Sequence, residues 1–163
     1  MIIRLTTSEI RRGAMAGLDR MLHVLEAGRQ HTHGTPNLGA WERHIEGALG
    51  ELAFAKYVGL EWDPHIGQVH LPDVGPYEVR TTSGKDWRGR PQETSLILHQ
   101  KDNDKALFFL LVGSIGHYDI MGGIRGKNGK VDRWWRSPGP HGRPAYFVPK
   151  EILIGPGNFG VGP

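Results

Sequence analysis

The stretch Leu71-Pro72-Asp73-Val74-Gly75-Pro76-Tyr77-Glu78-Val79-Arg80-Thr81-Thr82 contains a Gly-Pro turn followed by a run of alternating residue types. Alternation with a period of two predicts a strand over residues 77–82, in which Glu78 and Arg80 leave the backbone on the same face. If residues 69–74 run back beside this strand as a hairpin, the carboxylates of Asp73 and Glu78 converge at one end of a small sheet, beside the Arg80 guanidinium. Hard divalent cations prefer such a set of oxygen ligands.

A second helix is predicted before this stretch, separated from it by a connecting segment. Residues 40–58 have the apolar spacing of a helix that ends at Gly59. Gly47 and Gly50 each cost about 1 kcal/mol relative to alanine inside a helix, so we expect close packing of the helix on the sheet to compensate. Two interpretations of Glu51 stay open: its carboxylate points toward the acids of the hairpin, or it faces solvent as most glutamates do.

A first helix is predicted near the N-terminus. It starts at Thr6-Thr7-Ser8-Glu9, because Thr6 and Glu9 have the spacing of a capping box, and Gly28 ends it. The apolar stripe of this helix consists of Ile10, Ala14, Leu18, Met21, Leu22 and Leu25. The polar residues that fall away from the stripe are Arg11, Arg12, Asp19 and Arg20. We therefore expect a helix that covers the core, with its arginines on a solvated face.

Further strands are predicted after the central stretch. Residues 94–99 and 118–125 have strand character, and residues 106–113 form the most apolar run, as expected for a strand buried on both faces. Residues 146–148 precede Pro149 and are interpreted as an edge strand. The predicted fold is α/β, with a small mixed central β-sheet flanked by helices, N-terminal helices and a loop-rich C-terminal part. The glycine-rich tail of residues 155–163 is expected to be flexible.

Length, composition and charge favour a single soluble domain. The chain has 163 residues, 24 glycines, 11 prolines and no cysteine, which excludes disulfides, thiolate zinc sites and cysteine nucleophiles. The formal net charge of +3 favours an anionic partner. No apolar stretch approaches the roughly 20 residues that span a bilayer, and no signal peptide is visible. We expect a cytoplasmic protein that does not bind membranes, in a bacterial or phage-infected cell.

Three motifs resemble those of the PD-(D/E)xK nuclease superfamily, which has the restriction-endonuclease-like fold. Pro72-Asp73 resembles the first motif, Glu78-Val79-Arg80 the acid-x-lysine motif, and residues 47–55 with Glu51 the helix that carries a further acid. The resemblance covers about residues 40–112, within a core of about 40–125 in a single nuclease-like domain of 1–163. The sequence departs from the family at Arg80, where the family has lysine.

The resemblance implies a metal site and a role for each of its residues. Mg²⁺ or Mn²⁺ would be held by Asp73, Glu78 and the backbone carbonyl of Val79, with Glu51 as a direct or water-mediated ligand. Arg80 would meet the scissile phosphate. Because arginine stays protonated, it can stabilise negative charge but cannot act as a general base.

Basic residues outside the motifs are candidates for DNA contacts. The loop after the central strand contains Lys85, Arg88 and Arg90, which could contact phosphates, and Trp87, which could stack on a base. The same loop can also be read as a flexible surface loop with a partly buried tryptophan. Lys101, one strand further on, is a candidate to replace the missing lysine, although a turn lysine is normally solvated.

From these residues and the resemblance, we expect a metal-dependent nuclease that hydrolyses DNA phosphodiester bonds. The alternative is a catalytically inactive nuclease-fold module that binds DNA or a protein partner. A third interpretation treats the spacing of the acids as coincidence, in a small α/β scaffold for protein partners. The sequence leaves open the oligomeric state, including a homodimer.

Overall fold

A computed structural model describes residues 2–28, 38–68, 70–86, 88–137 and 143–161. Its main elements are β1 (Ile2–Arg4), α1 (Thr7–Glu26), α2 (Leu38–Val58), β2 (Tyr77–Thr82), β3 (Ser95–Leu98), β4 (Leu107–Ser114), β5 (His117–Arg125), α3 (Gly126–Gly129), β6 (Trp135–Arg136) and β7 (Ala145–Pro149). Three short 3₁₀ turns follow α3 and β7: η1 (Asp132–Trp134), η2 (Lys150–Ile152) and η3 (Pro156–Phe159). Trp87 and residue 69 lie outside the described residues.

The central sheet is mixed and has the strand order β1-β5-β4-β2. β2 runs parallel to β4, whereas β5 is antiparallel to both β4 and β1. The alternating side chains of β4 supply two separate hydrophobic clusters, with Phe109 in one and Phe108 in the other. The prediction of a mixed α/β fold with a small mixed sheet and a doubly buried strand over residues 106–113 is therefore confirmed.

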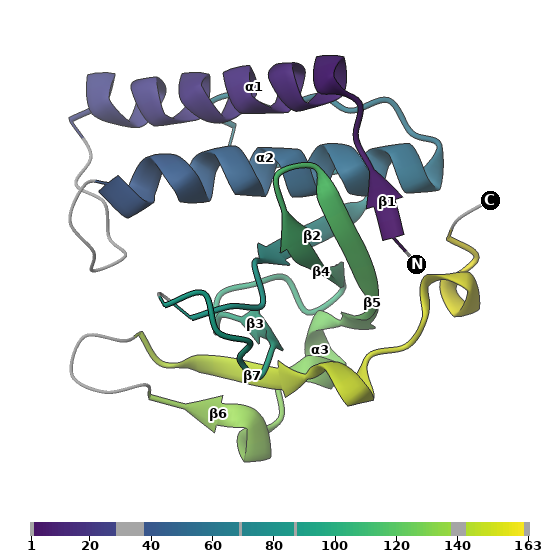
Figure 1. The fold of residues 1–163 in the computed structure, drawn as a ribbon. Coiled ribbons are helices and arrows are strands. Elements are labelled where there is room, and N and C mark those ends of the chain that lie inside the picture. Colours follow the sequence, from purple (N-terminus) through teal and green to yellow (C-terminus); the bar gives the residue numbers. More distant parts are fainter. Residues whose placement is uncertain (1, 29–37, 69, 87, 138–142, 162–163) are drawn as a thin grey trace.

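The layers differ from a sheet flanked by helices on both sides. α2 packs on one face of the central sheet, and α1 lies over α2, away from the sheet (Figure 1). The opposite face is covered by a second sheet with the order β3-β7-β6, whose Leu96, Leu98 and Val148 join Phe108 in one cluster. β7 is the middle strand of this sheet rather than an edge strand, because Pro149 pairs at its last position, where no further ladder bond is needed.

The contact between α1 and α2 is made by glycines rather than by leucines. The predicted capping box of Thr6 and Glu9 is present. Leu22 and Leu25, expected in the apolar stripe, are 41% and 52% exposed. The buried face instead contains Gly13 and Gly17, since a Cβ atom on Gly17 would lie 2.5 Å from the Ile45 Cα atom. Two glycines one turn apart therefore let the backbones of the helices approach closely.

Gly17→Ala is expected to destabilise the protein by about 1–3 kcal/mol, because the new methyl group meets backbone atoms of α2 that cannot move independently. Gly47→Ala is the matched control. A Cβ atom at Gly47 has no neighbour within 4 Å, so this change should stabilise α2 by about 0.5–1 kcal/mol through helix propensity. Urea denaturation measures both effects. Equal effects of the two changes would contradict the close helix contact.

The C-terminal segment, which we expected to be flexible, contacts the core through two of its residues. Phe159 packs edge-on against Phe109, with 5.9 Å between ring centroids, and Val161 is 4% exposed. Ile154 exchanges two backbone hydrogen bonds with Gly123 of β5. Residues 154–161 thus extend the core over the end of the central sheet.

Among the described helices, none combines the length and apolar character needed to cross a membrane.

Candidate active site

Asp73 is fixed against the free edge of β2. Val74 and Tyr77 exchange two backbone hydrogen bonds of 3.1 and 2.9 Å across the Gly75-Pro76 turn. The Asp73 carboxylate then accepts a 2.8 Å hydrogen bond from the Val79 N–H. The expected hairpin is reduced to this single bridge at Val74, because the Asp73 side chain takes the place that a second strand would occupy at this edge.

Three oxygens from this edge converge on one nitrogen of Arg80. The Arg80 Nη1 atom lies 3.6 Å from Asp73 Oδ2 and 3.6 Å from Glu78 Oε2, and it donates to the Val79 carbonyl at 3.4 Å. The Val79 carbonyl faces the same edge as the Val79 N–H, because both groups of a strand residue point to the same side. The two carboxylates and the carbonyl that sequence reasoning selected are thus brought together.

Glu78 is affected most by this arrangement. Partial burial and the negative charge of Asp73 raise the pKa of Glu78 from its usual value near 4.5 to about 7, against the opposing effect of Arg80. Hydrogen bonding between the Glu78 and Asp73 carboxyl groups acts in the same direction on the Glu78 pKa. Two carboxyl groups that share a site behave in this way because they cannot both ionise without repulsion. A cation that bound both of them would remove the repulsion.

Glu51 lies within electrostatic range of Asp73 but is held in a buried ion pair. Its side chain is 7% exposed, and both oxygens accept hydrogen bonds of 2.7 Å from Arg20 of α1. Trp62 Nε1 donates a further bond of 3.2 Å to Glu51. Burial raises the pKa of Glu51, an effect increased by the charge of Asp73 and opposed by Arg20. Arg20 thus faces inward, and the structure places both Glu51 oxygens on Arg20 rather than on the Asp73–Glu78 pair.

Asp73, Glu78 and Arg80 open into a cavity of about 590 Å³. Its lining also includes Lys101, whereas Glu51 lies behind Arg20 and does not reach it. The cavity lies beside the N-terminal end of β2, and its lining comes from α1, α2, the segment before β2 and the turn between β3 and β4. This position makes the two carboxylates accessible to a small ligand.

The turn between β3 and β4 supplies a third carboxylate that sequence reasoning missed. Asp102 Oδ2 lies 3.4 Å from Arg80 Nη2 and accepts a 2.9 Å bond from the His99 N–H. Lys130, at the end of α3, fixes the turn by donating to the Gln100 and Asp102 carbonyls and to the Asp104 carboxylate. No local motif marks Asp102, because its contact with Arg80 joins positions 22 residues apart.

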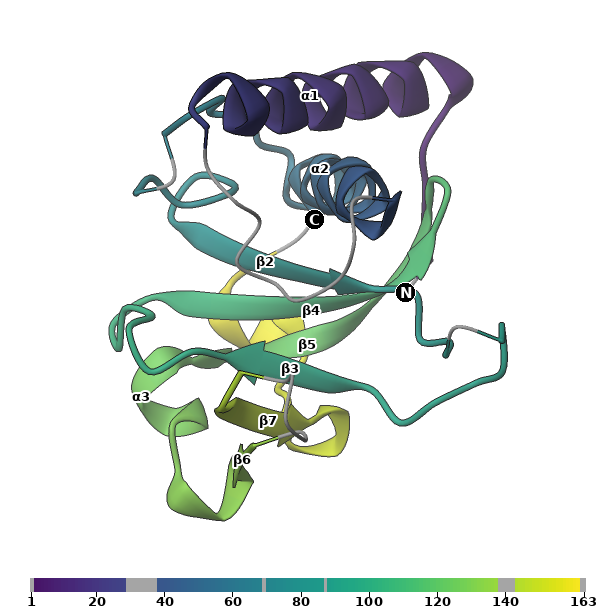
Figure 2. The same ribbon diagram turned by 90° about the vertical axis from the view of Figure 1, so that its left-hand side faces the viewer.

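The predicted DNA-binding loop lies at the other end of β2. Lys85, Arg88 and Arg90 are exposed, and Arg90 forms a 2.8 Å ion pair with Asp86. The loop leaves the C-terminal end of the strand, whereas the turn between β3 and β4, which lines the cavity, lies at the other end of β2 (Figure 2). The six residues of β2 span about 20 Å at roughly 3.3 Å per residue. DNA contacts by this loop stay a prediction and would require a substrate that extends along the whole strand. The predicted role of Trp87 falls outside the described residues.

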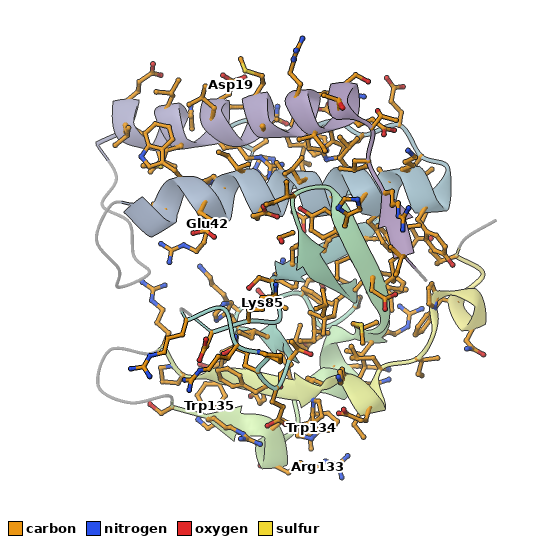
Figure 3. All side chains as sticks on the ribbon, in the orientation of Figure 1. Asp19, Glu42, Lys85, Arg133, Trp134 and Trp135 are labelled. Atoms are coloured by element: carbon orange, nitrogen blue, oxygen red, sulfur yellow. The ribbon has the colours of Figure 1, made fainter. Side chains whose placement is uncertain are left out.

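The two adjacent tryptophans, Trp134 and Trp135, differ in how far their side chains are buried. Trp134 is 7% exposed and joins the cluster under the second sheet, whereas Trp135 is 40% exposed. Both lie at the side of the molecule formed by β6 and β7 (Figure 3). Of these two tryptophans, only Trp135 is therefore exposed.

Neither the chain nor its structure is linked to a known family by comparison. No family model matches the sequence, and no curated protein and no solved structure gives a significant match. Within the part of the chain that the structure describes, no group of three or more Asp, Glu or His side chains is placed to hold a metal ion. The functional interpretation therefore depends on the geometry around Asp73 and Glu78.

Proposed function

We propose that this chain is a metal-dependent nuclease that hydrolyses DNA phosphodiester bonds, with a fold related to the restriction endonucleases. The observation that supports the proposal is the convergence of Asp73 Oδ2, Glu78 Oε2 and the Val79 carbonyl on a single cationic nitrogen, at the edge of an open cavity. These are the oxygens that the PD-(D/E)xK resemblance selects. In the structure these oxygens surround the positively charged Arg80 guanidinium, so their arrangement already suits a cation.

The donor set fits Mg²⁺ or Mn²⁺. Two carboxylates and one carbonyl suit a small hard cation that keeps several of its waters, so a third side-chain carboxylate is not needed. Glu51 is not assigned as a ligand, because Arg20 occupies both of its oxygens. A divalent cation held by Asp73, Glu78 and Val79 would supply Lewis-acid activation of a phosphoryl oxygen and of the attacking water.

The residues around this position would orient the DNA and stabilise charge. Arg80 lies over the Phe108 ring at 5.2 Å, and its Nη2 atom is paired with Asp102, so one side of the guanidinium is fixed while Nη1 faces the acids. In the proposed reaction, Arg80 turns this donor toward the negative charge that develops on the phosphate. Lys101 lines the same cavity and provides a second positive charge for the DNA backbone.

A second candidate is a module that binds DNA or a protein partner without catalysis. Its support is that every acid near the cavity already has a basic partner: Arg80 contacts Asp73, Glu78 and Asp102, and Arg20 holds Glu51. In this interpretation, the guanidinium of Arg80 permanently takes the place of the metal. The two candidates differ in whether a divalent cation can bind beside Arg80.

The test is the pH dependence of Mn²⁺ binding. Because the pKa of Glu78 is raised to about 7, the metal-free protein loses stability as the pH rises from about 4.5 through 7, where Glu78 becomes charged. Mn²⁺ binding must displace the Glu78 proton below this pH, so the apparent affinity should increase about tenfold per pH unit up to pH 7 and then level off. Thermal shift and calorimetry at pH 5.5, 6.5 and 7.5 measure this.

Glu78→Gln provides the control for the same titration. It removes the titrating carboxyl but keeps a side chain of the same shape, so Mn²⁺ should no longer raise the melting temperature at any of the three pH values. A Mn²⁺ shift that survives in Glu78→Gln places the ion elsewhere. If the parent protein gains no stability from Mn²⁺ even at pH 7.5, the inert module is the better account.

A further inference from the structure

The cavity has a second wall, which the proposed nuclease chemistry does not use. Besides the acids, its lining contains a set of imidazoles and one amide, which we call the histidine wall: His23, His44, His65, His70 and Gln68. These residues come from α1, from α2 and from the segment between α2 and β2. Side chains from three separate parts of the chain therefore gather around one cavity.

The segment before β2 has an unusual backbone at His65. His65 has a φ angle of +46°, in the left-handed region that costs energy for a residue with a side chain. Asp63 fixes this conformation, because its carboxylate accepts a 3.0 Å bond from the His65 N–H and lies 3.5 Å from His65 Nδ1. The strained backbone and the Asp63 contact together hold the His65 imidazole at the cavity.

Gly67 gives His23 its place in the wall. A Cβ atom at Gly67 would lie 2.7 Å from His23 Nε2, and Gly67 itself has a φ angle of +75°. Only glycine suits both the backbone conformation and the space that the imidazole requires. The segment from Asp63 to Gln68 is thus shaped so that imidazoles from two elements border the same cavity.

The remaining charges of the cavity nearly cancel. Arg20 is neutralised by Glu51 behind it, and Arg80 is shared among Asp73, Glu78 and Asp102. Lys101 is the other basic residue of the lining. Without bound metal, this balance gives an anionic substrate little attraction at neutral pH. Protonated imidazoles would change the balance, since histidine is the side chain that gains charge just below neutral pH.

We propose that the histidine wall binds a phosphate of a nucleic acid strand, next to the phosphate that lies at Asp73 and Glu78. This inference rests on the proposed function for the identity of the ligand, but not for the binding itself. Imidazolium N–H groups and the Gln68 amide are hydrogen-bond donors that suit phosphate oxygens. Two adjacent phosphates of one strand would then both lie in a cavity of about 590 Å³, one at the acids and one at the imidazoles.

The groups that face the histidine wall determine how its pH dependence must be measured. The lining itself contributes Arg20, Asp73, Glu78, Arg80, Lys101 and Asp102, while Glu51 lies behind Arg20 and Asp63 lies beside His65. Glu78 also loses its charge as the pH falls, which would favour an anion by itself. Binding is therefore measured in the Glu78→Gln background, where this contribution is absent.

The experiment titrates the full chain with the 5′-phosphorylated dinucleotide pTpT in EDTA, at pH 6.0 and pH 7.5. We expect binding to be about tenfold tighter or more at pH 6.0. His65→Gln and His70→Gln, each added to Glu78→Gln, should each weaken binding at pH 6.0 by about fivefold and reduce the pH effect. His117→Gln, an exposed histidine at the start of β5 that does not line the cavity, is the matched control and should have no effect.

Inorganic phosphate forms a second arm, which tests whether the wall recognises a nucleotide or any phosphate. We expect phosphate to bind more weakly than pTpT and to lose affinity in the same two variants. Far-UV circular dichroism checks that each variant is folded, and His70 is exposed, so its replacement should not disturb packing. Binding of both ligands that is unchanged by pH, or by His65→Gln and His70→Gln in folded protein, would overturn the inference.

The outcome also separates this inference from the nuclease proposal. Metal is absent from the assay, so a protein that fails to bind Mn²⁺ or to cleave DNA can still show histidine-dependent binding of pTpT. Conversely, a protein that cleaves DNA but binds pTpT without any contribution from His65 and His70 keeps the nuclease proposal and loses the histidine wall.

Discussion

Replacement of Arg20 by methionine is expected to destabilise the protein by about 3–5 kcal/mol, which is the usual cost of removing one partner of a buried ion pair. Arg20 donates two hydrogen bonds of 2.7 Å to Glu51, and its guanidinium also donates to the Pro64 carbonyl. Without Arg20, the Glu51 carboxylate stays buried with only the Trp62 N–H as a partner. Urea denaturation of the parent and of Arg20→Met measures the difference.

The loss of stability in Arg20→Met should depend on pH, because it depends on whether the buried Glu51 carboxyl is ionised. Burial already raises the pKa of Glu51, and removal of Arg20 should raise it further. A carboxyl whose folded pKa lies above its unfolded value contributes stability at low pH that disappears as the pH rises. Arg20→Met should therefore lose less stability relative to the parent at pH 5 than at pH 8.

Two further variants make the Arg20 result specific. Arg11→Met, on the exposed side of the same helix, should change stability by no more than about 0.5 kcal/mol. The double replacement Arg20→Met with Glu51→Leu removes both charges and should recover most of the loss, because an apolar pair needs no compensation. A double variant as unstable as Arg20→Met alone would contradict a simple ion pair. Recovery of Arg20→Met by Mn²⁺ would instead return Glu51 to the role of metal ligand.

The parts of the fold that the sequence predicted depend on local pattern. The alternating run at Tyr77–Thr82 and the apolar run over residues 106–113 both became strands of the central sheet. α2 ends one residue before Gly59, as predicted. These features follow from side-chain period and from turn chemistry within a few residues, which need no knowledge of distant partners.

The features that the sequence missed depend on distant pairing. The second sheet requires β3 to pair with β7, and no local signal specifies that partner. Helical periodicity placed Arg20 on a solvated face, but its long side chain reaches the Glu51 carboxylate between the two helices. The close contact of the two helices at Gly13 and Gly17 was not predicted, because the buried face of a helix is normally identified from large apolar residues such as leucine.

In the candidate site, too, the residues that the sequence brought together are local and the residue that it missed is distant. Asp73, Glu78 and Arg80 are brought together because a four-residue turn connects the first of them to the strand that holds the other two. Asp102 reaches them from another turn. The loop that carries Lys85, Arg88 and Arg90 lies away from them, because it follows the other end of β2. The catalytic and DNA-binding roles of all these residues stay predictions.

Asp73→Asn is expected to reduce DNA cleavage by at least about 10³-fold. The asparagine oxygen can still accept the hydrogen bond from the Val79 N–H, so the turn and the edge of β2 should keep their structure. What disappears is one of the two negative charges for the cation, and with it the several kcal/mol of transition-state stabilisation that a bound cation provides. Asp19→Asn, on the outer face of α1, is the same chemical change away from the site (Figure 3).

The most direct measurement is incubation of the purified parent protein with supercoiled plasmid and with single-stranded DNA, in Mg²⁺ or Mn²⁺, beside Asp73→Asn and Asp19→Asn prepared in the same way. The account predicts cleavage by the parent and by Asp19→Asn, with cleavage abolished by EDTA and by Asp73→Asn. Intact DNA with the folded parent in both metals, or cleavage that persists in Asp73→Asn, would contradict a nuclease centred on Asp73 and Glu78.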